Sequence, residues 1–280
     1  MTQEPLVLYE NPGSGVARVT LNRADARNAQ NLDLLLALDE AFSRAMVDEG
    51  VRVIILGAAG PHFSAGHDLR RILTDESEGR FGGRSAVGNF SAAGGAGYMA
   101  REEETFLALT RRWRNLTKPT IAQVQGRCIA AGLMLAWVCD LIIASEDAIF
   151  VDPVVAMGVS GVEWFVHPWE LGIRKSKELL FTGDSWDAHE AHRLGMVNQV
   201  VARDDLVRFT DAMAAKIASK PAFALKATKQ AINAALDAQG QTTATDMAFQ
   251  IHHLCHYHNR AMFGGEADPG GMPDIATKSP

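Results

Sequence analysis

Two loops of small residues could present backbone N–H groups to a ligand. One is PHFSAGHDL (61–69), directly after the Val/Ile-rich run 51–56. The other is QGRCIAAGL (125–133), directly after the similar run 120–125. The carboxyl ends of parallel strands are where ligands bind in α/β proteins, and a helix beginning near Ala131 would add its positive dipole end. Two such amides could stabilise an oxyanion, although tight strand–helix turns without chemistry would produce the same pattern.

The elements that must position these loops alternate between strand-like and helix-like patterns. Strand-like runs rich in Val and Ile occupy 16–21, 51–56, 120–125, 140–144 and 197–201. Between the first two lies 32–48, in which Leu35, Leu38 and Phe42 recur at helical spacing after a possible N-cap at Asn31. This alternation predicts an α/β fold with mainly parallel strands.

Composition divides the chain into three regions. Residues 1–203 hold the strands and are expected to form the core domain with the site, and 204–265 are expected to be a helical oligomerisation region. Within that region Pro221 suits the first turn of a helix. Within the core, 79–97 is rich in Gly, Ser and Ala, which predicts a flexible loop, either an active-site lid or a plain insertion. The tail 266–280 is expected to be frayed.

The composition argues against nucleic-acid and membrane partners. The 280 residues are 47% hydrophobic and 21% charged, with a net charge of −6 and no dense basic stripe. The apolar run from Cys128 is about a dozen residues, whereas a membrane span needs about 20. The N-terminus lacks the pattern of a secretory signal, and three cysteines make no disulfide framework, so we expect a cytoplasmic protein with free thiols.

Four segments together resemble the crotonase, or enoyl-CoA hydratase/isomerase, family. They are VTLNRADARNAQN (19–31), FSAGHDL (63–69), KPTIAQVQGRCIAAGLMLAWVCDLIIASEDAIFVDP (118–153) and KELLFTGDSWDAHEAHRLGMVNQVV (177–201). The resemblance implies a crotonase-like spiral of ββα turns with a C-terminal helical trimerisation region, assembled as a homotrimer or a dimer of trimers. It also implies an acyl-CoA substrate in fatty acid metabolism, with coenzyme A as part of the substrate and no separate cofactor or metal.

The resemblance also assigns roles to residues of both loops. The backbone N–H groups of Ala65 and Ala131 would form an oxyanion hole that stabilises an enolate. Asp68 would order its loop or cap the next helix. The remaining candidates for substrate and CoA binding are Arg27, Asn28, Ala29, Ser64, Gly66, His67, Gly132, Met134, Val154 and Trp164.

The chain departs from the family's hydratases at their two catalytic glutamates. The matching positions are Met134 and Val154, and neither side chain can transfer a proton. Glu163 lies close to where some isomerases and dehalogenases of the family carry an acid. Beside Trp164 and Phe165 its carboxylate could be desolvated and its pKa raised. The alternative is a solvated glutamate at a helix start.

Other polar residues have a chemical and a structural interpretation. His67 could shuttle a proton or order its loop by a hydrogen bond, and Asp152 precedes the lost second glutamate position but could point away. In HHLCHYH (252–258), His252 and His256 share a helix face as metal ligands would. No glutamate stands between them, so a surface or subunit-interface role is favoured.

The sequence therefore predicts an enzyme of the enoyl-CoA hydratase/isomerase family, a lyase or an isomerase. Loss of both usual glutamates favours double-bond isomerisation or related α-proton chemistry over two-glutamate hydration, with Glu163 as the proton-transfer group. Two alternatives stay open: a non-catalytic acyl-CoA-binding or scaffold homologue, and a CoA-thioester hydrolase.

Overall fold

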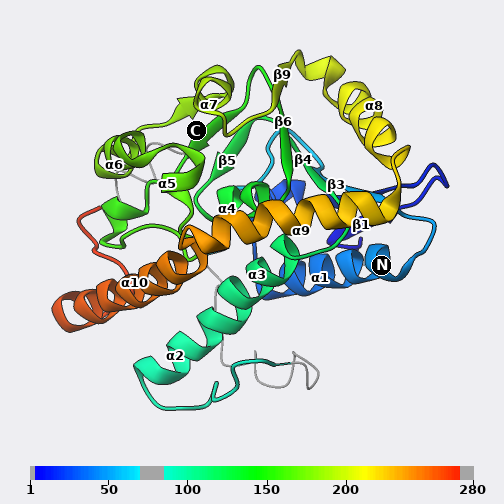
Figure 1. Ribbon diagram of the computed structural model, residues 1–280. Helices are drawn as coiled ribbons and strands as arrows, with labels where there is room; N and C mark the ends of the chain where they lie inside the picture. The colour runs from blue at the N-terminus through cyan, green and yellow to red at the C-terminus, as the bar shows by residue number, and fades with distance from the viewer. Residues whose placement is uncertain (1–3, 70–84, 272–280) are drawn as a thin grey trace.

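The computed structural model describes residues 4–69 and 85–271, and a six-stranded sheet forms its centre (Figure 1). The strands are, in sheet order, β1 (Val7–Glu10), β2 (Val16–Leu21), β3 (Val53–Ala58), β4 (Thr120–Val124), β6 (Leu141–Ser145) and β9 (Gln199–Val201). β1 pairs antiparallel with β2, and the other neighbours pair parallel. The mainly parallel α/β prediction is confirmed, with all five expected strands in place.

A second, three-stranded sheet was not predicted from the sequence. It contains β5 (Arg127–Ile129), β7 (Ile149–Val151) and β8 (Trp186–Asp187). Strands this short are below the length at which alternation becomes a signal. β5 lies within the second loop of small residues, 125–133, so this sheet also positions the site.

Ten α-helices are described. They are α1 (Leu32–Val47), α2 (Gly95–Glu102), α3 (Leu109–Arg114), α4 (Ala131–Trp137), α5 (His167–Glu170), α6 (Ile173–Thr182), α7 (Ala188–Leu194), α8 (Leu206–Ala218), α9 (Ala222–Ala238) and α10 (Gln241–Phe263). α1 begins as predicted, because the Asn31 side chain accepts a hydrogen bond from the backbone N–H of Leu34 at 3.0 Å. Pro221 is the N-cap of α9, one position before its first turn.

Alternation along the parallel strands buries both faces of the large sheet. Ile54 and Leu56 of β3 face one hydrophobic cluster with Leu38 of α1. Val53 and Ile55 face the other cluster with Leu206 at the start of α8. Successive side chains of a strand point to opposite faces, so helices must cover both. The sheet is thereby fixed from two sides, and the loops at its carboxyl edge are held in register.

A long helical stretch replaces the end of the expected flexible loop. Residues 79–84 of that prediction lie outside the described residues, and α2 begins at Gly95. A π-helical segment, Glu103–Ala108, joins α2 to α3. Glu104, on this segment, is buried and accepts hydrogen bonds from Ser85 Oγ and from the backbone N–H groups of Ala86 and Val87. The helix was missed because a buried acidic residue breaks the apolar periodicity; whether the loop is a lid stays a prediction.

The described part of the tail is anchored to the fold, contrary to the expected fraying. The backbone N–H of Asp268 donates to the carbonyl of Met157 at 2.8 Å. Glu266 pairs with Arg260 of α10 and accepts a hydrogen bond through its carbonyl from Asn259 at 3.0 Å. Residues 272–280 lie outside the described residues.

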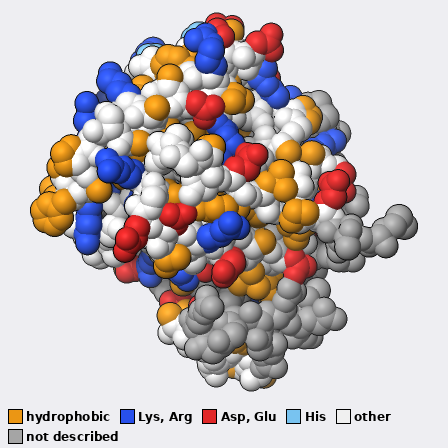
Figure 2. All heavy atoms as spheres, turned by 90° about the vertical axis from the view of Figure 1, so that its right-hand side faces the viewer, with side chains coloured by type: hydrophobic (Ala, Val, Ile, Leu, Met, Phe, Trp, Pro, Cys, Tyr) orange, Lys and Arg blue, Asp and Glu red, His pale blue; other side chains and the backbone are white. Residues whose placement is uncertain are grey.

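The distribution of charged side chains on the surface and the apolar length of the helices can be compared with the predictions from composition. On the face shown in Figure 2, acidic and basic side chains are interspersed and form no continuous basic stripe. Among the described residues, no helix is both long enough and apolar enough to cross a membrane.

Candidate active site

The two loops predicted from the sequence lie against each other. The backbone N–H of Ile129 donates to the carbonyl of Ser64 at 2.9 Å. A Cβ on Gly66 would lie 2.8 Å from the Ile129 carbonyl oxygen and 3.3 Å from the Ala131 nitrogen. A Cβ on Gly132 would lie 2.7 Å from the Ser64 carbonyl oxygen. Both glycines therefore permit the close backbone approach that brings the loops together.

The amide of Ala65 is committed to a structural hydrogen bond, which corrects its predicted role. It donates to the Arg27 carbonyl at 3.0 Å. Within residues 4–69 and 85–271, by contrast, the backbone N–H of His67 donates no hydrogen bond. Its neighbours in the chain face the other way, toward Gln30: Gly66 accepts at 2.8 Å and Asp68 donates at 2.9 Å. His67 and Gln30 form an isolated parallel β-bridge. Successive backbone groups of a strand point to opposite sides, so the His67 N–H points away from Gln30.

The second predicted donor, the backbone N–H of Ala131, follows an unusual turn at the start of α4. Ala130 holds a left-handed φ of 48°, and its own N–H donates to the Val151 carbonyl at 2.8 Å. Such a backbone is uncommon for a residue with a side chain and persists only where its surroundings hold it. Ala131, the first residue of α4, follows this turn and is fully buried.

Ser64 has a structural role in its loop. Its hydroxyl is buried, donates to the Asn28 carbonyl at 2.9 Å and accepts from Gly66 and Gln30 at 3.2 Å each. Asp68 forms an ion pair with Arg23 at 2.7 Å, in keeping with the predicted loop-ordering role.

The segment 27–29, which is expected to contact CoA, contains one buried and one exposed polar residue. Asn28 is fully buried, and its side-chain amide donates to the carbonyls of Ala59 and His62 at 3.0 Å each. Arg27 is exposed, with a left-handed φ of 54°, and Ala29 is half-buried beside it. Asn28 therefore shapes the turn, while Arg27 has a side chain free to meet solvent or ligand.

The two positions of the missing glutamates are apolar and packed. Met134 is 3% exposed within α4, and Val154 packs against the same hydrophobic cluster. Burial also raises the pKa of the Cys128 thiol, which therefore stays neutral and serves as a packing residue.

Glu163 is buried and paired, not solvated. Both carboxylate oxygens lie within hydrogen-bond distance of His67 Nε2, at 3.1 and 3.2 Å. Burial by itself would raise the pKa of Glu163, but the charge and hydrogen bond of His67, together with the charge of His252, lower that pKa below its usual value. This corrects the expected upward shift: Glu163 is an ionised carboxylate, which is the form that accepts a proton. The ring of Phe106 lies 3.9 Å from the His67 ring and fixes its orientation.

Asp152 acts on the backbone that carries Glu163. Its carboxylate pairs with His167 Nε2 at 2.9 Å and accepts from the backbone N–H of Val162 at 3.3 Å. Both partners of the ion pair are 1% exposed. The side chain thus pairs with His167 and not with His67 or Glu163, in line with the expectation that it could point away, and it holds the residue before Glu163.

Replacing Asp152 by Ala should destabilise the protein by about 3–5 kcal/mol, because a buried His167 loses its partner and Val162 loses an acceptor. Denaturant unfolding would measure this. Asp184→Ala, at an exposed position, is the control and should stay within about 0.5 kcal/mol of the parent. A loss below about 1 kcal/mol for Asp152→Ala would show that the pair contributes little.

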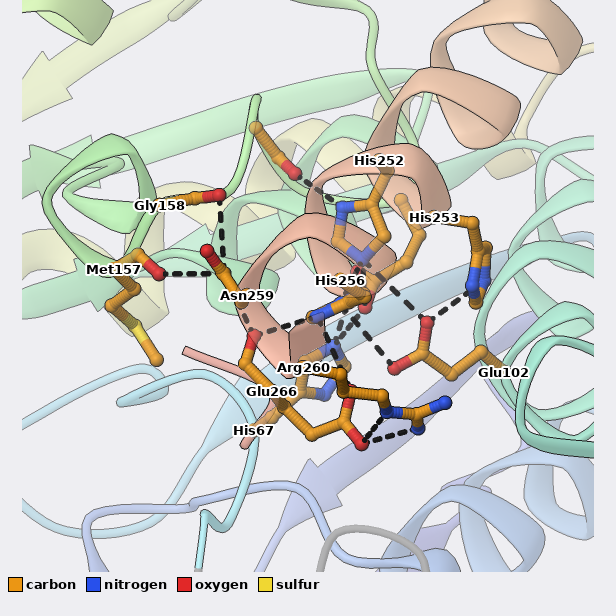
Figure 3. Close-up of polar contacts among 12 residues, drawn as sticks. His67, Glu102, Met157, Gly158, His252, His253, His256, Asn259, Arg260 and Glu266 are labelled. Atoms are coloured by element: carbon orange, nitrogen blue, oxygen red, sulfur yellow. Dashed lines mark hydrogen bonds and ion pairs between the residues drawn. The ribbon is translucent and has the colours of Figure 1, made fainter. Parts of the chain in front are cut away.

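Three of the four histidines of α10 are interior, which overturns the surface role expected for His252 and His256; the subunit-interface alternative stays a prediction. His252, His253 and His256 are at most 8% exposed and converge on Glu102 of α2 (Figure 3). His252 Nε2 also lies 3.9 Å from Glu163 Oε1. Glu102 was missed because an acidic residue next to Glu103 and Glu104 looks like part of a solvated helix face. These groups border the site through Glu163.

A cavity among the described residues lies apart from this centre. It measures about 580 Å³ and lies between the end of α4 and α9. Trp164 lines it, whereas His67, Ala131 and Glu163 do not. Glu170 also lines it, and burial raises the pKa of this carboxyl to about 7.

Glu170 should make stability depend on pH. A carboxyl with a raised folded pKa binds more protons folded than unfolded, so stability falls as pH rises from about 4.5 to about 7. Glu170→Gln should therefore raise the free energy of unfolding by about 1–2 kcal/mol at pH 8 and change it little at pH 4.5. Denaturant unfolding at both pH values measures the difference, and an equal effect at both would contradict it.

Comparison with known proteins agrees with this architecture. The family description "Enoyl-CoA hydratase/isomerase" matches residues 11–262. The chain is 46% identical over 269 residues to the putative enoyl-CoA hydratase EchA13 of Mycobacterium tuberculosis, covering 94% of this chain and 85% of that protein. It is 34% identical to the short-chain-enoyl-CoA hydratase of Clostridium acetobutylicum, covering 81% and 80%.

Solved structures give the same result. A probable enoyl-CoA hydratase from Mycobacterium thermoresistibile superposes with a TM-score of 0.86 at 46% identity, covering 95% of this chain and 100% of that one. A probable enoyl-CoA hydratase from Mycobacterium smegmatis gives 0.85 at 46% identity, covering 94% and 98%. The fold is thus that of a crotonase. The chain belongs to the enoyl-CoA hydratase/isomerase family of acyl-CoA enzymes.

Proposed function

We propose that the protein shifts a double bond, or performs related α-proton chemistry, on an acyl-CoA thioester, with Glu163 moving the proton. The observation that carries this proposal is the buried, ionised Glu163 held by His67 directly beside the two paired loops. Met134 and Val154 offer no acid or base at the usual hydratase positions, so a one-carboxylate reaction fits the residues present.

The thioester oxygen would bind to the amides of His67 and Ala131. The His67 N–H has no hydrogen-bond partner among the described residues, and Gly66 brings its loop against the Ala131 nitrogen. Donors of this kind, fixed before charge develops, stabilise an enolate oxyanion by 10²–10³ in rate each. The amide of Ala65 has no part in this proposal.

Glu163 would then accept a proton from carbon and return it to another carbon of the same acyl chain. Removal of the proton leaves its electron pair in the enolate, whose negative oxygen stays in the hole. Protonation at the second carbon by the Glu163 carboxyl moves the double bond and regenerates the carboxylate. No oxidant, reductant or separate cofactor is required, because coenzyme A is part of the substrate.

The remaining features support binding and assembly. Arg27 is exposed in the segment 27–29, which is proposed to contact CoA, and suits a phosphate group. Large apolar side chains are exposed on α9 and α10, among them Phe223 at 82% and Leu254 at 67%. Such residues suit burial against further copies of the chain, and we propose a homotrimer or a dimer of trimers in the cytoplasm.

A panel of enoyl-, dienoyl- and 3-hydroxyacyl-CoA thioesters tests the reaction. Double-bond movement without change in mass supports isomerisation, and addition of water would assign hydration, the activity in the names of the relatives. Release of free CoA would assign thioester hydrolysis. Binding without turnover across the panel would leave an acyl-CoA-binding scaffold.

A further inference from the structure

Four ionisable side chains of α2 and α10 meet in the interior beside Glu163 (Figure 3). Glu102 is 2% exposed, and His252, His253 and His256 are 5%, 3% and 8% exposed. The proposed proton transfer uses none of them. A carboxylate and imidazoles at this depth have lost their hydration and need polar or cationic partners to offset it.

In two of these rings, a hydrogen bond to a backbone carbonyl determines which nitrogen carries the proton. Nδ1 of His252 lies 2.8 Å from the Gly161 carbonyl oxygen, and Nδ1 of His256 lies 2.9 Å from the Glu266 carbonyl oxygen. A carbonyl oxygen can only accept, so both Nδ1 atoms carry protons and both neutral rings have a lone pair on Nε2. Those two Nε2 atoms are 2.9 Å apart. Two facing lone pairs at this distance require a cation.

Glu102 offers a third ligand that a metal ion would use and a shared proton would not. Its Oε2 lies 3.6 Å from His252 Nε2 and its Oε1 lies 3.8 Å from His256 Nε2, beyond hydrogen-bond length. Its Oε2 is buried and also lies 3.0 Å from Nε2 of the third histidine, His253. A shared proton would be held by the two imidazoles alone, whereas a metal ion would also bind the carboxylate that faces them.

We propose that Glu102, His252 and His256 form a binding site for a divalent transition-metal ion, for which Zn²⁺ is the best match. Two imidazole nitrogens and a carboxylate are ligands that Zn²⁺ prefers, and their candidate atoms all lie within 4.8 Å of one another. Metal-bound histidines usually donate their other N–H to a carbonyl or carboxylate, as both do here.

The spacing of the ligand atoms fits such an ion. Zinc–ligand bonds of about 2.0–2.2 Å in a tetrahedral site place the ligand atoms about 3.4 Å apart. The two Nε2 atoms are 2.9 Å apart, and they lie 3.6 Å from Oε2 and 3.8 Å from Oε1 of Glu102, on either side of that value. The ion would tie α2 to α10 and place positive charge near Glu163, independent of which reaction Glu163 performs.

Metal binding by the purified full-length protein tests this site. The chain is stripped with chelator, loaded with Zn²⁺ and dialysed, and its metal content and melting temperature are measured. We expect one Zn²⁺ per chain and a higher melting temperature with the ion. His256→Gln should weaken Zn²⁺ binding at least tenfold, whereas His258→Gln, at an exposed position on the same helix, should not. Retention of less than stoichiometric zinc, or equal affinity in both variants, would overturn the proposal.

A second measurement observes the imidazole nitrogens directly. Nitrogen NMR of the histidine rings reports which nitrogen binds metal, and Zn²⁺ should shift the Nε2 signals of two rings that His256→Gln assigns to His252 and His256. If that variant does not fold, Glu102→Gln serves the assignment. Unchanged Nε2 signals on saturation with Zn²⁺ would show that the imidazoles share a proton instead, and would overturn the proposal.

Discussion

Glu163→Gln should lower kcat by about 10²–10⁴ while leaving the affinity for CoA thioester nearly unchanged. The amide keeps the size of the carboxyl but cannot accept a proton, so the enolate would have no base to form it. It can still pair with His67, which keeps the fold close to that of the parent. Steady-state kinetics with the substrate identified in the thioester panel, and calorimetric titration with a non-reacting acyl-CoA, would measure the two effects separately.

The control for this variant is Glu146→Gln, which changes an exposed carboxylate and should keep full activity. If Glu163→Gln retained more than about a tenth of the parent rate, another group must move the proton. A large rise in KM with an unchanged kcat would place Glu163 in binding instead of proton transfer.

Gly66→Ala should lower kcat/KM by about 10²–10³, the effect of losing one oxyanion donor. The added Cβ would lie 2.8 Å from the Ile129 carbonyl oxygen and 3.3 Å from the Ala131 nitrogen, so the two loops must move apart. The glycine also holds a φ of 85°, which strains any residue with a side chain. We expect a loss of about 2–3 kcal/mol in unfolding free energy as well.

Gly183→Ala is the control that separates the effect of backbone strain from the effect of steric overlap. Gly183 ends α6 with a φ of 68°, and a Cβ there would meet no atom within 4 Å. This control should lose about 1 kcal/mol of stability and no activity. Equal activity in the two variants would show that the paired loops do not form the oxyanion hole, whatever the change in stability.

Local pattern was enough to predict the elements that build the sheet. The Val/Ile-rich runs gave five of its strands, and Asn31 marked the start of α1, because strand and helix periods and caps are properties of neighbouring residues. The same pattern failed for α2 and the π-helical segment. Their buried acids, Glu102 and Glu104, have partners distant in sequence, and no local period reports such a partner.

The sequence by itself determined which loops meet, through the small residues that only a close backbone approach requires. It also determined that the usual hydratase glutamates are absent and that Glu163 is the nearest substitute. The tertiary structure decided which amides of those loops remain free, since the bond from Ala65 to Arg27 depends on how two distant segments pair. It decided the charge of Glu163 as well, because His67 lies against it at 3.1 Å and, together with His252, reverses the effect of burial on its pKa. Ionisation and hydrogen bonding depend on what surrounds an atom in space, and residues 96 positions apart become neighbours only when the chain folds.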